Sequence, residues 1–249
     1  MDKLLEVCDL KVWFPIRKGV FARTVGWVKA VDGVSFDLTR GETLGLVGES
    51  GCGKSTTARV IAGLVRPTGG GFTLRGRLGM VFQDPLGSLN PRMTVRSALD
   101  EVLVHSSASA GEARRTAREL LEMVGLDAAA LDRYPHEFSG GQRQRICIAR
   151  ALASDPELLV CDEAVSALDL SIRAQVLELL IDLKRRLDLG VLFITHDIGV
   201  VQHVADRVLV MNRGRIVESG VCREVLANPR EDYTKYLISA VPKIGKPLV

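Results

Sequence analysis

The chain has 249 residues, of which 47% are hydrophobic, so it can bury one substantial core or a core with a small subdomain, and we do not expect disorder. Its 33 Lys and Arg residues against 30 Asp and Glu give a formal net charge of +3, too small to predict a nucleic-acid partner. The five cysteines show neither CxxC spacing nor an even count, which argues against a disulfide framework and predicts reduced, mostly buried thiols.

The distribution of apolar residues argues against a membrane-spanning chain. A spanning helix needs roughly 18 or more consecutive apolar residues, and no stretch provides them. The first residues, MDKLLEVCDL, include acidic side chains and no long apolar run, so we expect no signal peptide. We therefore expect a cytosolic protein whose link to a membrane comes through a partner.

Apolar, β-branched segments alternate with helical patterns along most of the chain. This alternation is typical of an α/β fold, in which a parallel sheet is covered by helices on both faces. The expected strands lie at 5–12, 34–38, 43–47, 78–82, 158–161, 191–195 and 207–211, and helices are expected at 54–65, 140–153 and 171–188.

The segment from Gly48 to Ser55, GESGCGKS, fits the GxxxxGK[ST] pattern of a phosphate-binding loop (P-loop). It follows an apolar run and precedes a helical pattern, which is the context that the motif requires; the alternative is an ordinary glycine-rich turn. Lys54 is expected between the β- and γ-phosphates of ATP, and the Ser55 hydroxyl on Mg²⁺. The residues predicted to bind the nucleotide here are Gly48, Ser50, Gly51, Cys52, Gly53, Lys54, Ser55 and Thr56.

The alternation is interrupted between residues 91 and 138. Helical patterns at Thr94–Val104 and Glu112–Val124 surround the polar loop Ser106–Gly111, and no convincing strand occurs. We therefore expect a helical insertion in a single domain. In that domain of residues 1–249, segments 1–90 and 141–249 would form the α/β core with a β subdomain, and 91–140 the insertion.

A second candidate anion site follows this insertion. Ser139 is a good N-cap, and Gly140 and Gly141 leave backbone N–H groups unshielded at the start of a helix. A glycine-rich loop that only caps the helix is the alternative.

Two adjacent carboxylates, Asp162 and Glu163, follow the apolar strand 158–161. Two negative charges at the end of a buried strand require a cation or solvent, and a solvated strand end is the alternative. Because side chains alternate along a strand, one carboxylate can bind Mg²⁺ while the other serves the attacking water. We assign Asp162 to Mg²⁺ and Glu163 to the water as general base.

The last third of the chain completes the expected sheet. Ser171 is expected to cap the helix over 171–188. His196 follows an apolar run, so it should emerge at the carboxyl edge of the sheet, where α/β proteins bind ligands. Residues 208–212 and 215–218 are expected to form a β-hairpin.

Four segments resemble the motifs of ABC ATPases, in the order found in that family. Phe138–Gln142, FSGGQ, is similar to the LSGGQ signature, Val81–Pro85 to the Q-loop, Ser166–Asp169 to the D-loop and Thr195–Asp197 to the H-loop. The resemblance covers nearly the whole chain. It implies a P-loop NTPase (RecA-like) core with a mainly parallel sheet, a small antiparallel β subdomain and a helical signature subdomain.

The resemblance also implies how two subunits work together. They would pair head to tail, so that each ATP lies between the P-loop of one subunit and the signature of the other. His196 would contact the γ-phosphate and assist Glu163, and Gln83 would take part in catalysis and in holding Mg²⁺. The residues so assigned to nucleotide binding are Ser139, Gly140, Gly141, Gln142 and Asp169.

The family supplies an aromatic ring for adenine near the end of the first strand. Phe14 is the residue that we predict, with Phe21 and Trp27 as alternatives. Trp13 and Phe14 could equally be core or staple residues.

One branch of the family is the most similar. Segments 27–36, 83–92, 133–138 and 233–242 resemble ATP-binding subunits of oligopeptide and dipeptide permeases. That resemblance implies import of short peptides or of a related solute such as nickel or glutathione. It also implies a second, similar but different ATPase chain, two transmembrane permease subunits, an indirect link to an extracytoplasmic solute-binding protein, and a place at the cytoplasmic face of the membrane.

Two departures from this branch concern the solute more than the ATPase. The segment Arg66–Met80 is short, so part of the antiparallel subdomain is expected to be trimmed, and Ala164 stands where Pro is usual. An exporter ATPase remains an alternative. A DNA-repair or translation ATPase would carry long coiled coils or two ATPase domains, and a P-loop kinase would not need the signature.

Overall fold

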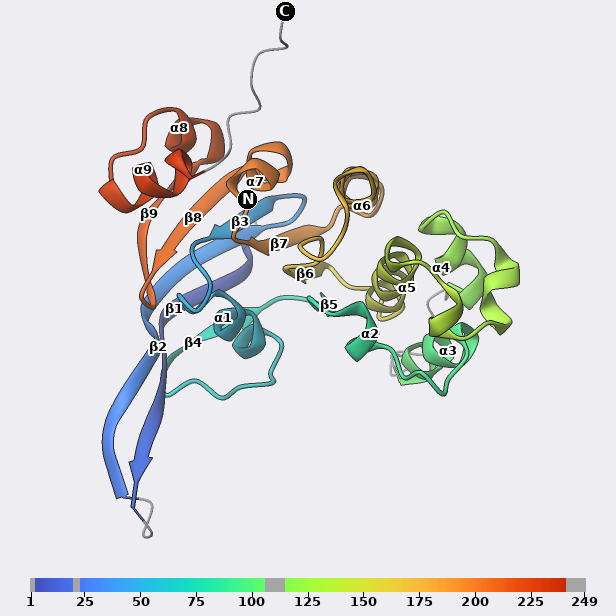
Figure 1. Cartoon of the computed structure of the whole chain (residues 1–249), viewed down its shortest axis with the longest axis horizontal. Helices are drawn as coiled ribbons and strands as arrows, with labels where there is room; N and C mark the ends of the chain where they lie inside the picture. The colour runs from blue at the N-terminus through green and yellow to red at the C-terminus, as the bar shows by residue number, and fades with distance from the viewer. Residues whose placement is uncertain (1–2, 20–22, 106–114, 241–249) are drawn as a thin grey trace, which may run out of the picture. The chain divides into compact units, whose positions relative to one another are not determined.

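The structure, a computed structural model, describes residues 3–19, 23–105 and 115–240 (Figure 1). The chain divides into two compact units. The first comprises residues 1–5, 37–42 and 74–192, and the second residues 6–36, 43–73 and 193–249.

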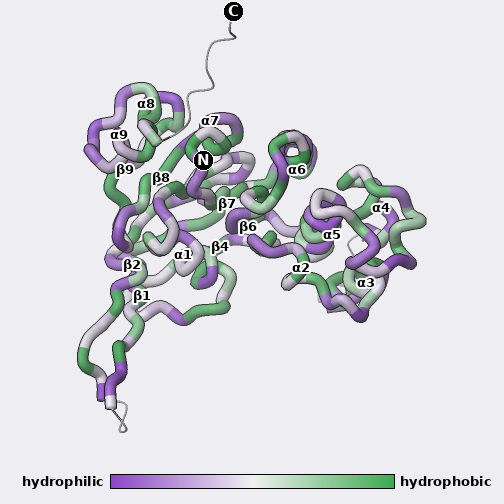
Figure 2. The backbone as a smooth tube through the Cα atoms, viewed as in Figure 1, coloured by the Kyte–Doolittle hydropathy of each residue, from purple (hydrophilic) through white to green (hydrophobic). Residues whose placement is uncertain are grey.

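The second unit is built on β3 (Thr43–Val47), all five residues of which are buried. β3 pairs in parallel with β8 (Arg207–Asn212), and β8 pairs antiparallel with β9 (Arg215–Val221). The last residues of β7 (Gly190–Thr195) lie on the other side of β3. Since the central residues of these strands are buried on both faces, they form apolar runs, and Figure 2 shows much of β7 and β8 in the green of hydrophobic residues.

Three helices near the end of the chain pack on this sheet. They are α7 (Ile198–Val204), α8 (Cys222–Ala227) and α9 (Asp232–Ser239). Val47 of β3 and two valines of β8 share one hydrophobic cluster with Val201, Val225 and Leu237, one from each helix. This shared core anchors α9 to the strand that leads into the P-loop.

A separate three-stranded sheet has the order β2-β1-β4 and is a small antiparallel sheet. It contains β1 (Lys3–Lys18), β2 (Arg23–Thr39) and β4 (Gly69–Leu74). Figure 1 shows β1 and β2 in blue as a long hairpin. The sequence predicted only the parts at 5–12 and 34–38, because the outer parts of both strands lack a buried face that would make the pattern apolar.

The first unit contains the parallel pair β5 (Leu78–Val81) and β6 (Leu158–Asp162), with Val81 opposite Cys161. Helix α5 (Gly140–Leu152) packs on β5 and against α6 (Leu170–Leu187). The described elements between β5 and α5 are α2 (Pro85–Ser88), α3 (Val95–His105), α4 (Ala117–Met123), η1 (Ala128–Asp132) and η2 (Pro135–Glu137).

The predicted strands and long helices are present, with shifted ends at several of them. In the described parts of 91–138 the secondary structure is helical and contains no strand, while the predicted loop Ser106–Gly111 lies outside the described residues. The predicted cap of α6 was wrong. Asp169 is the N-cap and α6 begins at Leu170, so Ser171 lies inside the first turn.

Strand β4, within Arg66–Met80, was not predicted. The helix predicted at 54–65 is α1 (Lys54–Ile61), which ends four residues earlier than expected. None of the helices within residues 3–19, 23–105 and 115–240 has the length and apolar character needed to cross a membrane.

Candidate functional site

The P-loop in the second unit requires glycine at two positions for reasons of space. Gly48 has φ 155° and Gly53 has φ 116°. A Cβ at Gly48 would collide with the carbonyl oxygen of Met211, and one at Gly53 with the carbonyl oxygen of Ala30. The loop therefore lies directly against the backbone of its own unit, as a loop that must wrap a polyphosphate does.

Lys54 is folded onto the loop that precedes it. Its side chain is nearly buried, and its ammonium group donates to the carbonyl oxygens of Gly48 at 2.7 Å and Glu49 at 2.8 Å. The Cys52 thiol lies 3.8 Å from the same ammonium group, and burial raises the pKa of this thiol despite the nearby positive charge. The positive charge that the P-loop motif requires is thus positioned by the backbone carbonyls of the loop itself.

The remaining P-loop residues present polar groups from the start of α1. Ser55 and Thr56 are half-buried, and Ser50 and Gly51 are exposed. Gly53 is the N-cap of α1, and its carbonyl oxygen accepts from the amide of Thr57 at 3.0 Å. Helix α1 therefore begins directly at the P-loop lysine, and a helix N-terminus favours an anion.

His196 follows β7, which neighbours β3 in the sheet. It is exposed, and the chain turns directly after it because Asp197 caps α7, accepting from the amide of Gly199 at 2.9 Å. The predicted position after a buried strand is confirmed, so His196 and the P-loop leave neighbouring strands of the second unit.

The two carboxylates of the first unit differ in backbone conformation. Asp162 is the last residue of β6 and is 5% exposed, whereas Glu163 has left the strand with φ 49°. A non-glycine residue in this left-handed region costs about 1–2 kcal/mol and is typical of functional positions. The Glu163 carbonyl is held by the amide of Ser166 at 3.1 Å and by its hydroxyl at 2.9 Å. Strand alternation, which we expected to separate the two side chains, is thus replaced by a backbone turn.

Gln83 leaves the strand next to the one that ends at Asp162. Because Val81 lies opposite Cys161 in the parallel pair, Gln83 and Glu163 are each two residues beyond paired positions. Gln83 is exposed, and Asp84 after it caps α2 by accepting from the amide of Leu86 at 2.9 Å. The first unit therefore brings the predicted Q-loop and the carboxylate pair to neighbouring strand ends.

The signature begins α5 with a capping box. The Ser139 hydroxyl accepts from the amide of Gln142 at 3.3 Å, and the Gln142 side chain accepts from the amide of Ser139 at 3.0 Å. A Cβ at Gly141 would collide with Ile172 of α6, whereas one at Gly140 would meet its nearest atom, Leu168 Cδ2, at 3.8 Å. Gly141 thus permits close packing of two helices, and Gly140 is exposed towards solvent.

Asp169 is the last of the predicted nucleotide-binding residues in the first unit. It is exposed and is the N-cap of α6, directly after the predicted D-loop. A Cβ at Gly140 would approach Leu168, which precedes Asp169, so the D-loop and the signature are neighbours in this unit.

The candidate adenine-binding aromatics differ in exposure. Phe14 in β1 is 44% exposed and Trp27 in β2 is 54% exposed, while Phe21 lies outside the described residues. The alternative that Phe14 is a core residue is therefore wrong. The Trp13 indole donates to the Asp32 carboxylate at 3.1 Å, and the Lys29 ammonium lies 4.3 Å from its ring centroid, so this ring has partners within its own unit.

The donor atoms assigned to Mg²⁺ fit that ion chemically. They are the hydroxyl of Ser55, the buried carboxylate of Asp162 and the amide oxygen of Gln83, all hard oxygen ligands. Mg²⁺ is usually bound by one or two carboxylates together with substrate phosphates and water. Within the described residues no group of three or more His, Cys, Asp or Glu side chains could form a metal site without such a substrate.

Sequence reasoning missed two contacts of the site loops. The Tyr233 hydroxyl of α9 accepts a hydrogen bond from the Glu49 amide of the P-loop at 3.0 Å. In the first unit the Arg150 guanidinium donates to the backbone carbonyl of Ser88. The side-chain hydroxyl of Ser88 lies 3.3 Å from the Cys147 sulfur. The one indication in the sequence is that Tyr233 begins segment 233–242, which resembles ATP-binding subunits of peptide permeases.

Comparison with known proteins agrees with these motifs. A family model described as ABC transporter matches residues 31–166. The oligopeptide transport ATP-binding protein AppF of Bacillus subtilis is 49% identical over 98% of this chain and 80% of its own length. The dipeptide transport ATP-binding protein DppF of Escherichia coli is 48% identical over 97% and 77%, and OppF of Salmonella typhimurium, an oligopeptide transport ATP-binding protein, is 50% identical over 96% and 78%.

Solved structures of the same kind are similar in fold. The ATP-binding cassette MJ0796, in a dimeric post-hydrolysis state bound to ADP and Pi, has a TM-score of 0.73 and 26% identity over 88% of this chain and 99% of its own. CbiO1 from Clostridium perfringens, part of the ABC transporter complex cbiONQ, has a TM-score of 0.74 and 26% identity over 92% of each chain. The chain therefore belongs to the ABC transporter family and is one of its ATP-hydrolysing subunits.

Proposed function

We propose that this chain binds Mg-ATP and hydrolyses it to power the import of oligopeptides or dipeptides. The observation that carries the choice of solute is the identity of 48–50% over nearly the whole chain to subunits named for oligopeptide and dipeptide transport. Such similarity extends beyond the ATPase motifs to nearly the whole chain.

The P-loop is the proposed cradle for the polyphosphate. Gly48, Ser50, Gly51, Cys52 and Gly53 bring the backbone close to it, and Lys54 supplies the positive charge. Ser55 and Thr56 begin α1, whose N-terminus favours an anion. Bound Mg²⁺, held by Ser55, Asp162 and Gln83, would neutralise charge that develops on the β- and γ-phosphates.

The catalytic roles follow from the chemistry of three side chains. Glu163 accepts a proton from the attacking water, and His196 holds the γ-phosphate and the water in place. Gln83 orients the same water. Phe14, exposed near the end of the predicted first strand, stacks on adenine.

The signature is proposed to act on a second subunit's nucleotide. Ser139, Gly140, Gly141 and Gln142 offer a second anion-binding helix start, and Asp169 lies next to them. The similar MJ0796 cassette is dimeric, which supports a pair of subunits. We propose a pair with a similar but different ATPase chain, two transmembrane permeases at the cytoplasmic face, and an indirect link to a solute-binding protein. We expect no nucleic-acid partner.

A reconstituted transporter tests this function. The chain, its partner ATPase and the two permeases in vesicles should hydrolyse ATP faster when a peptide-loaded binding protein is added, and labelled dipeptide should enter. The matched control is Glu163→Gln, which should bind Mg-ATP but hydrolyse about 10²- to 10⁴-fold more slowly. Because the hydrogen bonds from Ser166 go to the Glu163 backbone carbonyl, this variant keeps the local fold.

Glutathione import is the second candidate, because a glutathione import protein, GsiA of Pectobacterium atrosepticum, is 47% identical over 97% of this chain. That match covers 41% of the relative's own length. Stimulation by glutathione and not by dipeptides in the same vesicles would replace the peptide assignment and leave the ATPase intact.

A further inference from the structure

Both backbone polar groups of Glu49 are hydrogen-bonded. Its amide donates to the Tyr233 hydroxyl at 3.0 Å. The Glu49 carbonyl accepts from the Lys54 ammonium at 2.8 Å and from the Cys52 amide at 3.3 Å. Glu49 therefore connects a tyrosine of α9 to the lysine that the P-loop directs at phosphate, all within the second unit.

Tyr233 is itself fixed by its surroundings. It packs against the hydrophobic cluster that contains Val47 of β3, the strand leading into the P-loop. The next residue, Thr234, is fully buried, and so is most of Leu237. The hydroxyl of Tyr233 is thus presented by a helix that cannot shift without disturbing the core.

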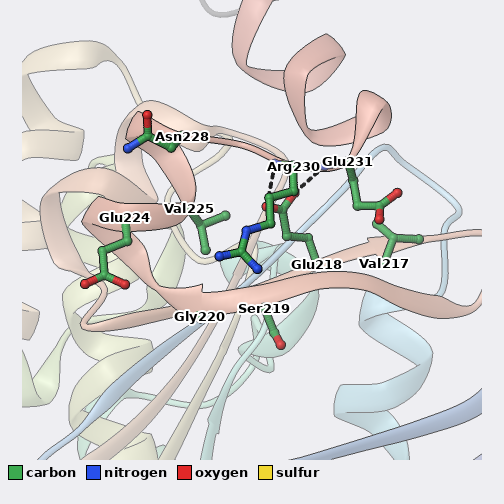
Figure 3. Close-up of a pocket in the computed structure, with 9 residues that line it drawn as sticks. All are labelled: Val217, Glu218, Ser219, Gly220, Glu224, Val225, Asn228, Arg230 and Glu231. Atoms are coloured by element: carbon green, nitrogen blue, oxygen red, sulfur yellow. Dashed lines mark hydrogen bonds between the residues drawn. The ribbon is translucent and has the colours of Figure 1, made fainter.

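The start of α9 has a second anchor on β9. The Glu218 carboxylate accepts from the amides of Arg230 at 2.9 Å and Glu231 at 3.2 Å, as Figure 3 shows with dashed lines. Glu218 lines a cavity of about 530 Å³, which β9 and α8 also line. The helix is therefore held on its core face and at its N-terminal end, although a cavity lies beside it.

We propose that Tyr233 is a positioning residue for ATP binding, acting through Glu49 on the P-loop and on Lys54. The inference rests on the proposed nucleotide site. Without the hydroxyl, the Glu49 amide loses its partner. The peptide unit that it shares with the Gly48 carbonyl can then rotate, and this carbonyl accepts from the Lys54 ammonium at 2.7 Å. ATP must then order the loop as it binds, and the free-energy cost of this ordering weakens ATP binding.

The test compares two tyrosines of the same helix. Tyr233→Phe removes only the hydroxyl, while Tyr236→Phe makes the same change at a side chain that is 57% exposed and stacks on Tyr233. Titration of the full chain with Mg-ATP by calorimetry should show about 2- to 12-fold weaker binding for Tyr233→Phe, the range of one net hydrogen bond. Tyr236→Phe should bind as the wild type does.

Two further readouts separate positioning from a general structural role. In the assembled transporter, KM for ATP should rise by the same factor while kcat stays within about twofold, since saturating ATP orders the loop. Hydrogen exchange at the Glu49 amide should accelerate in Tyr233→Phe, and the midpoint of thermal unfolding should remain that of Tyr236→Phe.

The outcomes distinguish the two proposals. Wild-type affinity in Tyr233→Phe, an equal loss in Tyr236→Phe, or a fall in kcat that follows a fall in thermal midpoint each overturn the role of Tyr233 alone. A wild-type chain that binds no Mg-ATP overturns the nucleotide site and this inference with it.

Discussion

At the scale of the residue, Lys54 combines near-complete burial with a single cluster of backbone acceptors. Replacing it by alanine removes charge-assisted hydrogen bonds to the phosphates worth about 1.5–3 kcal/mol. Lys54→Ala should therefore bind ATP about 10- to 150-fold more weakly, as measured by calorimetry. Lys18→Ala, at an exposed position of β1, is the control and should bind normally. Unchanged affinity in Lys54→Ala would remove the P-loop from the proposed site.

Cys161, next to Asp162, makes folding stability depend on pH. Burial and the neighbouring Asp162 charge raise the pKa of this thiol to about 12 from its ordinary value of 9.0. Between these values the unfolded chain releases the proton and the folded chain retains it. The stabilising contribution is therefore complete below pH 9 and is lost as pH rises towards 12, at up to about 1.4 kcal/mol per pH unit.

Urea unfolding at pH 8.5 and 10.5 checks this dependence. The wild-type free energy of unfolding should fall between the two pH values by about 1–2 kcal/mol more than that of Cys161→Ala. The cavity left by alanine lowers stability at both values and cancels in the comparison. Burial also raises the pKa of Cys52, Cys147 and Cys222, but these thiols are present in both proteins. Equal pH dependence of the two proteins would contradict the assignment.

At the scale of the element, the start of α5 has two glycines with different tasks. Gly140 has room for a side chain, so Gly140→Asp should fold, and its carboxylate would repel the γ-phosphate of a partner's ATP. The isolated subunit should bind ATP with near-normal affinity but lose nucleotide-driven association and most hydrolysis. Light scattering and nucleotide titration in a Glu163→Gln background, with the partner chain supplied, measure both properties.

Two variants control for this experiment. Gly140→Ala should keep association, since the nearest atom to its Cβ is at ordinary contact distance, whereas Gly141→Ala should lower the thermal midpoint by colliding with Ile172. If Gly140→Asp weakened ATP binding to the isolated subunit as much as Lys54→Ala, both anion sites would serve one nucleotide in one chain. The head-to-tail dimer would then be wrong.

At the scale of the whole molecule, coupling to a permease should pass through the segment that follows Gln83. Leu86 on α2 is 53% exposed, whereas Ser88 on the same helix faces Cys147. In an assembled, active complex, Leu86→Cys should crosslink to a cysteine in a cytoplasmic loop of a membrane subunit. Val25→Cys, at a 58% exposed position of β2, should not. Crosslinks from Val25 with none from Leu86 would move the docking surface elsewhere.

Features that depend on residues close together in the chain could be predicted from the amino-acid sequence. The P-loop, the buried strand β3 and the capping box of Ser139 with Gln142 all involve residues within a few positions of one another, so spacing and residue type predict them. The order of the ABC motifs then identified the family, and the strand ends that carry Asp162 and His196 followed from apolar runs.

Contacts between residues that are distant in sequence could not be predicted and are seen in the folded chain. Tyr233 meets Glu49 across 184 positions, and no local pattern encodes that pair. The left-handed turn at Glu163 and the N-cap of α6 at Asp169 in place of the predicted Ser171 depend on how loops pack. The exposed outer strands of the β1–β2 hairpin gain stability from pairing with each other, which leaves little apolar periodicity to read. Local physics therefore predicted the binding loops, and long-range packing determined how they are held.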